Sequence, residues 1–130
     1  MKSNKAAEKE VSLLISKKKN EQEIKIQMKK LGTYKPQYNT IISIFAGILT
    51  QYEEFERQFA ESGYQITEEY TNKAGAVNER KVPIYTALES LRKDIITYSD
   101  RLCLNPKSLE TVTTQAKNSS VLAAALREMK

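Results

Sequence analysis

The sequence contains no histidine, one cysteine, four glycines and three prolines among its 130 residues. Without histidine, and without a second cysteine to form a CxxC pair, the usual kinds of zinc site are excluded. A single cysteine also excludes an internal disulfide, which is consistent with a reducing compartment. No stretch approaches about eighteen apolar residues, so no transmembrane helix is expected. We therefore predict no metal, no other cofactor and no membrane partner.

Residue patterns that carry catalysis are equally scarce. The four glycines form neither GxxxxGK[ST] nor GxGxxG, so no phosphate-binding loop is recognisable. Asp94 and Asp100 are six residues apart on one expected helix, a spacing that does not place them on one face. Cys103 lies in a Leu-Cys-Leu run and is interpreted as a small buried hydrophobic residue. The sequence therefore predicts that the protein is not an enzyme.

Positive charge is concentrated in the N-terminal third. Residues 1–37 contain ten lysines and four glutamates, a net charge of +6, whereas residues 38–130 contain eleven basic and twelve acidic residues, a net charge of −1. A localised cationic segment is a candidate for binding nucleic-acid phosphates or an anionic membrane surface. The simpler interpretation is a lysine-rich helix face that is only solvated.

Two long amphipathic helices are predicted in the middle of the chain. From about Gln37 to Ser62, apolar side chains recur at spacings of four and three, at Ile41, Phe45, Ile48, Tyr52, Phe55 and Phe59. From Pro83 to about Leu104, a second apolar stripe contains Leu88, Leu91, Ile95 and Leu102. The stripes are similar in length, so we expect the two helices to pack antiparallel and these ten residues to form the core and the oligomerisation surface.

A small β-hairpin is predicted between these helices. Residues 64–70 and 76–82 favour strands, and Asn72-Lys73-Ala74-Gly75 between them has the composition of a turn. Two strands are not stable alone in water. We therefore expect the hairpin to pack on the helices or on a neighbouring subunit.

Two short helices are predicted before the first long helix. Residues 1–10 are expected to be frayed, and a first apolar face (Val11, Leu14, Ile15) ends at three consecutive lysines. Asn20 followed by Glu23 resembles a capping box and is expected to start a second helix, which ends at Gly32.

The predicted fold is mainly α, with short N-terminal helices, two long antiparallel helices joined by a hairpin, and a C-terminal helical tail. The expected organisation is a basic DNA-binding segment at 1–36, an oligomerisation core at 37–113 and a tail at 114–130. In the tail, Leu122, Leu126 and Met129 form a narrow apolar stripe.

Several short motifs occur in a familiar order. Leu31-Gly32-Thr33-Tyr34-Lys35-Pro36 precedes the first long helix, Asn72-Lys73-Ala74-Gly75 forms the turn, and Leu102-Cys103-Leu104-Asn105-Pro106 ends the second. Over roughly residues 30–110 this layout resembles the small terminase subunit family of tailed phages. Members of that family often carry Leu-Gly-Leu-Thr-Pro at the last position. Here both leucines and the proline match, while cysteine and asparagine differ.

The resemblance implies a non-enzymatic DNA-packaging factor that assembles into a ring. Its implied partners are double-stranded viral DNA, further copies of itself and a large terminase subunit that carries the ATPase and nuclease. It also implies a phage or prophage protein that acts in the bacterial cytoplasm. The DNA-contacting candidates are the lysines of the basic segment, Lys17, Lys18, Lys19, Lys25, Lys29 and Lys30.

Two further expectations concern partners. Residues 119–130 are predicted to contact the large subunit. The alternative function is a helical protein-interaction adaptor without enzymatic activity, in which the lysines serve only solubility.

Overall fold

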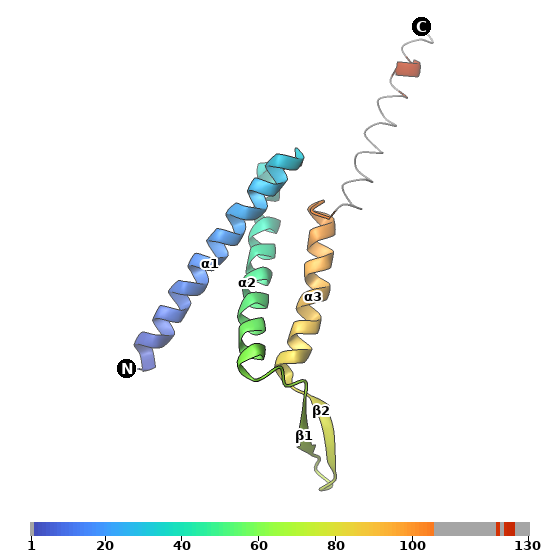
Figure 1. Ribbon diagram of the computed structural model, residues 1–130. Coiled ribbons are helices and arrows are strands. Elements are labelled where there is room, and N and C mark those ends of the chain that lie inside the picture. The colour runs from blue at the N-terminus through green and yellow to red at the C-terminus, as the bar shows by residue number, and fades with distance from the viewer. Residues whose placement is uncertain (1, 106–121, 123, 127–130) are drawn as a thin grey trace.

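The computed structural model describes residues 2–105, 122 and 124–126, and it places α2 between α1 and α3 (Figure 1). The protein is mainly helical with one two-stranded antiparallel sheet, which confirms the predicted class. The elements in chain order are α1 (Lys2–Leu31), the 3-10 turn η1 (Pro36–Tyr38), α2 (Asn39–Glu61), β1 (Thr67–Thr71), β2 (Val77–Lys81) and α3 (Pro83–Arg101). Most of the predicted C-terminal tail lies outside the described residues.

The predicted pair of short N-terminal helices is wrong, because residues 2–31 form one helix of 30 residues. Asn20 does not cap a new helix but lies within α1, buried against α2. Its Nδ2 donates a hydrogen bond to Thr50 Oγ1 at 3.1 Å, and that hydroxyl donates in turn to the carbonyl oxygen of Ala46 at 2.8 Å. Because the side-chain amide is satisfied by Thr50 of α2, it does not bond to the backbone of its own helix as a cap would, and Asn20 can lie in the middle of α1.

The helices α2 and α3 run antiparallel. Near one end of the pair Phe45 stacks on Tyr98, with ring centroids 6.1 Å apart, and near the other end Phe59 contacts Tyr85 at 5.7 Å. Of the ten residues expected to line this pair, five are buried, namely Phe45, Phe59, Leu88, Leu91 and Leu102. The other five are half-buried, namely Ile41, Ile48, Tyr52, Phe55 and Ile95.

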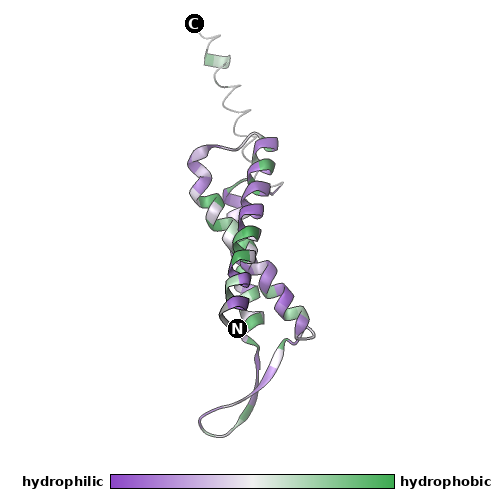
Figure 2. Cartoon of the chain, turned by 90° about the vertical axis from the view of Figure 1, so that its left-hand side faces the viewer, coloured by the Kyte–Doolittle hydropathy of each residue, from purple (hydrophilic) through white to green (hydrophobic). Residues whose placement is uncertain are grey.

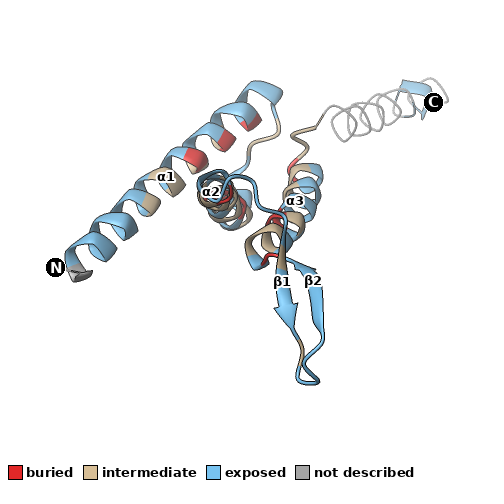
Figure 3. Cartoon of the chain, turned by 60° about the horizontal axis from the view of Figure 1, so that its bottom comes forward, coloured by how far each residue is buried: buried red, intermediate tan, exposed pale blue. Residues whose placement is uncertain are grey.

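The main hydrophobic cluster joins all three helices at the end of the bundle where α1 turns into α2. Its buried members are Ile24, Met28, Ile42, Phe45, Ala46 and Leu102. The buried positions of α1 therefore lie in its C-terminal half, while towards its N-terminus the helix leans away from α2 (Figure 3). Most of the stability of a helix in a folded protein comes from packing and not from intrinsic helix propensity, so this half is expected to hold α1 in place.

The hairpin extends from the opposite end of the helices into solvent (Figure 2). Nine of its ten strand residues are exposed. Its turn is held by Asn72, whose Oδ1 accepts hydrogen bonds from the backbone N–H groups of Ala74 and Ala76. Lys81 at its base forms an ion pair with Glu89 of α3 at 2.9 Å, but the described strands are not buried against the helices. Of the two supports expected from the sequence, packing on a neighbouring subunit therefore stays a prediction.

All three helices end in the same backbone motif. At each end one N–H donates to the carbonyl oxygen three residues back, and the N–H of the next residue donates to the carbonyl oxygen five residues back, which is a Schellman turn. The residue that bonds three back is Gly32 after α1, Gly63 after α2 and Cys103 after α3. The motif requires a left-handed residue, and Gly32 (φ 74°) and Gly63 (φ 77°) supply it after α1 and α2. After α3 it is Cys103 (φ 56°), at the position where the Leu-Gly-Leu-Thr-Pro motif has glycine.

Replacing Cys103 by glycine is therefore expected to raise the free energy of unfolding by about 0.5–1 kcal/mol, since a left-handed conformation costs an L-residue about 1–2 kcal/mol and glycine regains part of this. Thermal or urea unfolding measures the change. Cys103→Ala removes the thiol and keeps the Cβ atom, so it should not stabilise. Equal stabilities of the glycine and alanine variants would contradict backbone strain at this position.

Candidate nucleic-acid interface

The six lysines expected to contact DNA all lie on α1, but they do not share one environment. Four are exposed, namely Lys18, Lys19, Lys29 and Lys30, and the other two are half-buried. At about 100° per residue, Lys18, Lys25 and Lys29 fall on one side of the helix, and Lys18 and Lys29 are separated by about 16 Å along its axis. These side chains therefore form a cationic ridge along a flank of α1, about 120° around the helix axis from the buried Ile24.

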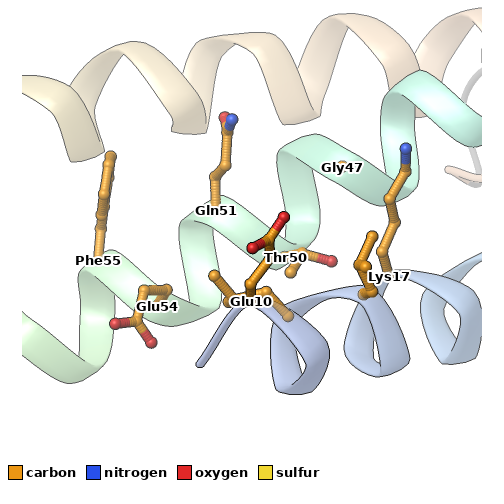
Figure 4. A pocket seen from close by; sticks show the side chains of 9 residues that line it. Glu10, Lys17, Gly47, Thr50, Gln51, Glu54 and Phe55 are labelled. Atoms are coloured by element: carbon orange, nitrogen blue, oxygen red, sulfur yellow. The ribbon is translucent and has the colours of Figure 1, made fainter. Parts of the chain in front are cut away.

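Lys17 belongs to a different surface. Its side chain lies in a groove of about 480 Å³ between α1 and α2, which is also lined by Leu13, Leu14 and Phe55 (Figure 4). A Cβ atom on Gly47 of α2 would lie 3.7 Å from the Lys17 Cε atom, so the stem of the lysine packs where α2 has no side chain. A long basic side chain commonly buries its methylene stem in this way. Lys17 therefore lies against α2 and is not part of the cationic ridge.

Two further cations reach the same end of the bundle from other parts of the chain. Lys35, in the loop between α1 and α2, and Arg101, in the last turn of α3, line a common hollow. Sequence reasoning missed both, because 66 positions separate them and each is an isolated charge in its own segment. We name as the basic end the residues Lys25, Lys29, Lys30, Lys35 and Arg101.

Ion pairs gather elsewhere in the molecule. The bases that form them are Lys9, Arg57, Arg80, Lys81 and Arg92, and the acids are Glu54, Glu56, Glu61, Glu68 and Glu89. Within the described part of the chain, no cation of the basic end has a carboxylate within 4.0 Å. Lys29 instead lies over the ring of Tyr34, at 5.1 Å from its centroid. The basic end therefore keeps its positive charge available to an external anion.

Helix dipoles reduce this charge only slightly. The C-termini of α1 and α3 and the N-terminus of α2 meet here, and each carries about half an elementary charge, negative at the C-termini and positive at the N-terminus. The net contribution is about −0.5. Asp100, in the last turn of α3, adds one carboxylate. Five cations outweigh both effects, so the basic end stays strongly positive.

Glu54 shows the opposite situation on α2. Hydrogen bonds from Arg57, then from Gln58 and Lys9, lower the pKa of Glu54 to about 2. Its carboxylate stays ionised at neutral pH and binds Lys9 at 3.0 Å between Nζ and Oε1. Lys9 is thus committed to a contact within the molecule and is a poor candidate for binding DNA.

The described residues contain no group of three or more histidine, cysteine, aspartate or glutamate side chains that could hold a metal ion. Within the same residues, none of the helices has the length and apolar content to cross a membrane. The surface feature that remains for a functional role is the ridge on α1 together with the basic end.

A family model described as "Phage terminase, small subunit" matches residues 19–119 of the chain. No curated protein and no solved structure matches. The matched region contains the basic end, both central helices and the hairpin, and it leaves out the N-terminal half of α1 with Lys17 and Lys18.

Proposed function

Because the chain belongs to the phage terminase small-subunit family, we propose that it forms rings, recognises viral DNA for packaging and regulates a large subunit that carries the ATPase and nuclease. In this role it binds DNA without catalysing a reaction and acts in the cytoplasm of the bacterial host. The observation that carries the proposal is the positive charge of the basic end and the adjoining ridge, which has no carboxylate partner within the part of the chain that the structure describes.

Phosphate contacts are the chemistry that this surface offers. Lys18, Lys29 and Lys30 are exposed and have no carboxylate partner among the described residues. Each lysine that neutralises a phosphate releases condensed counterions from the duplex, so several such contacts together give substantial affinity at low salt. A ring repeats the same surface in every subunit, which raises the overall affinity further.

Uncovered apolar surface supports assembly into an oligomer. Val11, Leu14 and Ile15 are each more than half exposed on the part of α1 that leans away from α2. Ile96 is 63% exposed on α3, on the other side of α2. Since these residues lie on opposite flanks of the molecule, a head-to-tail contact between successive copies can bury both, and such contacts close into rings.

The contact with the large subunit stays a prediction for residues 119–130, most of which lie outside the described part. Leu122 and Leu126 are exposed there, at 61% and 58%. They share one side of a helical turn, so they offer a partner protein a small apolar surface.

Native mass spectrometry and duplex binding together test the proposed function. We expect native mass spectrometry to give the mass of an oligomer, several times the mass of one subunit. We also expect DNA affinity to fall about 500-fold between about 50 and 200 mM salt if five phosphates are contacted, at a slope of about −0.9 per phosphate. A stable monomer that does not bind duplex DNA at low salt would contradict both ring formation and DNA recognition. That result would favour the protein-interaction adaptor, for which the apolar patch on α1 would be the binding surface.

A further inference from the structure

A hollow of about 270 Å³ lies between the α1–α2 loop and the end of α3. Its floor is apolar and contains the buried side chains of Met28 and Leu102. Its polar lining includes Lys35, Tyr38 and Arg101, which come from the loop, from η1 and from α3. Side chains from three separate elements thus converge on one concave site.

The lining of this hollow carries positive charge only. None of its lining residues is an aspartate or a glutamate. Among the described residues, neither Lys35 nor Arg101 has a carboxylate within 4.0 Å. The Arg101 guanidinium lies 5.9 Å from the centroid of the Tyr98 ring, a contact that leaves its N–H donors for another partner.

We propose that this hollow binds one backbone phosphate of duplex DNA, an inference that rests on the proposed DNA-binding function. Arg101 and Lys35 hold the phosphate oxygens by charge-assisted hydrogen bonds, and the Tyr38 hydroxyl donates a further one. The deoxyribose carbons lie against Met28 and Leu102.

Its position joins the hollow to the ridge on α1. Lys29 and Lys30 are in the last turn of α1, and Gly32 at its end lines the hollow. A DNA strand that passes along the outer face of α1 therefore reaches the hollow without leaving the basic surface. Because α3 contributes Arg101, this contact ties the DNA to a second helix of the bundle.

The test compares the full-length double variant Lys35→Gln/Arg101→Gln with the matched control Lys73→Gln/Lys93→Gln. The control removes the same charge from exposed positions in the hairpin turn and on α3. For the first variant we expect the slope of log affinity against log salt to flatten by about 0.9, the value for one phosphate, and duplex affinity at about 50 mM salt to fall roughly 10-fold. The control should leave the slope and the affinity almost unchanged. Circular dichroism melting verifies that both variants are folded.

The outcomes separate this inference from the proposed function. If the unmodified protein does not bind duplex DNA, the proposed function fails and the inference fails with it. If the unmodified protein binds with a steep salt dependence and the two double variants behave alike, DNA binding stands and the assignment of the hollow is overturned.

A competition experiment identifies the source of the phosphate. Thymidine monophosphate at constant ionic strength should displace the duplex no better than chloride does. Displacement that is specific to the monophosphate and is lost in the Lys35→Gln/Arg101→Gln variant would assign the hollow to a free phosphate monoester instead. That result would overturn the backbone assignment.

Discussion

Replacing Lys18, Lys29 and Lys30 together by glutamine is expected to weaken duplex binding on the order of 1,000-fold at about 50 mM salt. Each phosphate contact contributes a factor of roughly 10 at this salt concentration relative to about 1 M salt, given a slope of about −0.9 per contact. Fluorescence anisotropy with a labelled duplex measures the loss. The effect should shrink steadily as salt is raised, because the lost contacts are electrostatic.

Neighbouring lysines on α1 provide the control. Lys18 is exposed on the ridge, whereas Lys17 lies in the groove beside Gly47. Lys18→Gln should therefore cost about tenfold in affinity, and Lys17→Gln, which removes the same charge one residue away, should cost about twofold or less. Equal losses would show that only the overall charge of the chain matters, and would refute a defined DNA-binding face on α1.

Met28→Ala is expected to lower the free energy of unfolding by about 3 kcal/mol. The side chain is 1% exposed and lies in the cluster with Ile42 and Phe45, so truncation leaves a cavity among the three helices. Ile26→Ala, two residues earlier on the outer face, should change stability by about 0.5 kcal/mol or less, because Ile26 is 49% exposed. Urea unfolding of the full-length chain measures both. A small effect of Met28→Ala would mean that α1 is a separable arm.

This packing changes how DNA binding should be dissected. Residues 1–31 carry the whole ridge, so deleting them is the obvious test from the sequence. In the structure the deletion also removes Ile24 and Met28 from the cluster that they share with Ala46 and Leu102. If such a truncated protein failed to bind DNA, the cause could be unfolding of the bundle or the loss of the lysine contacts, and the experiment would not distinguish the two. Single substitutions on the outer face avoid this ambiguity.

The central helices and the hairpin could be predicted from the sequence because their signals are local. Apolar residues spaced by three and four define α2 and α3, and the predicted bounds lie within a few residues of the observed ones. Asn72 to Gly75 correctly marks the turn between the strands. Such patterns need no knowledge of the partner element.

The errors and omissions arise where distant residues decide. Asn20 has the local appearance of a helix cap, and only Thr50, 30 positions away, reveals it as a buried residue of a continuous helix. The family resemblance could be recognised despite this error, since its motifs follow the ends of α1 and α3 and form the hairpin turn, away from Asn20. Lys35 and Arg101 line one hollow because the start of α2 packs beside the end of α3, and each is an isolated charge that no local pattern marks as part of a site.

The Asn20–Thr50 hydrogen bond also fixes the position of α1 along α2, and with it the spacing of the charged side chains. Sliding α1 along α2 by one helical turn, about 5.4 Å, would move the buried amide away from its only side-chain partner within the described residues and leave it unsatisfied. One polar pair in the middle of the bundle thus sets how far Lys29 and Lys30 stand from Arg101 on another helix, and so fixes the spacing of phosphates that each subunit can match.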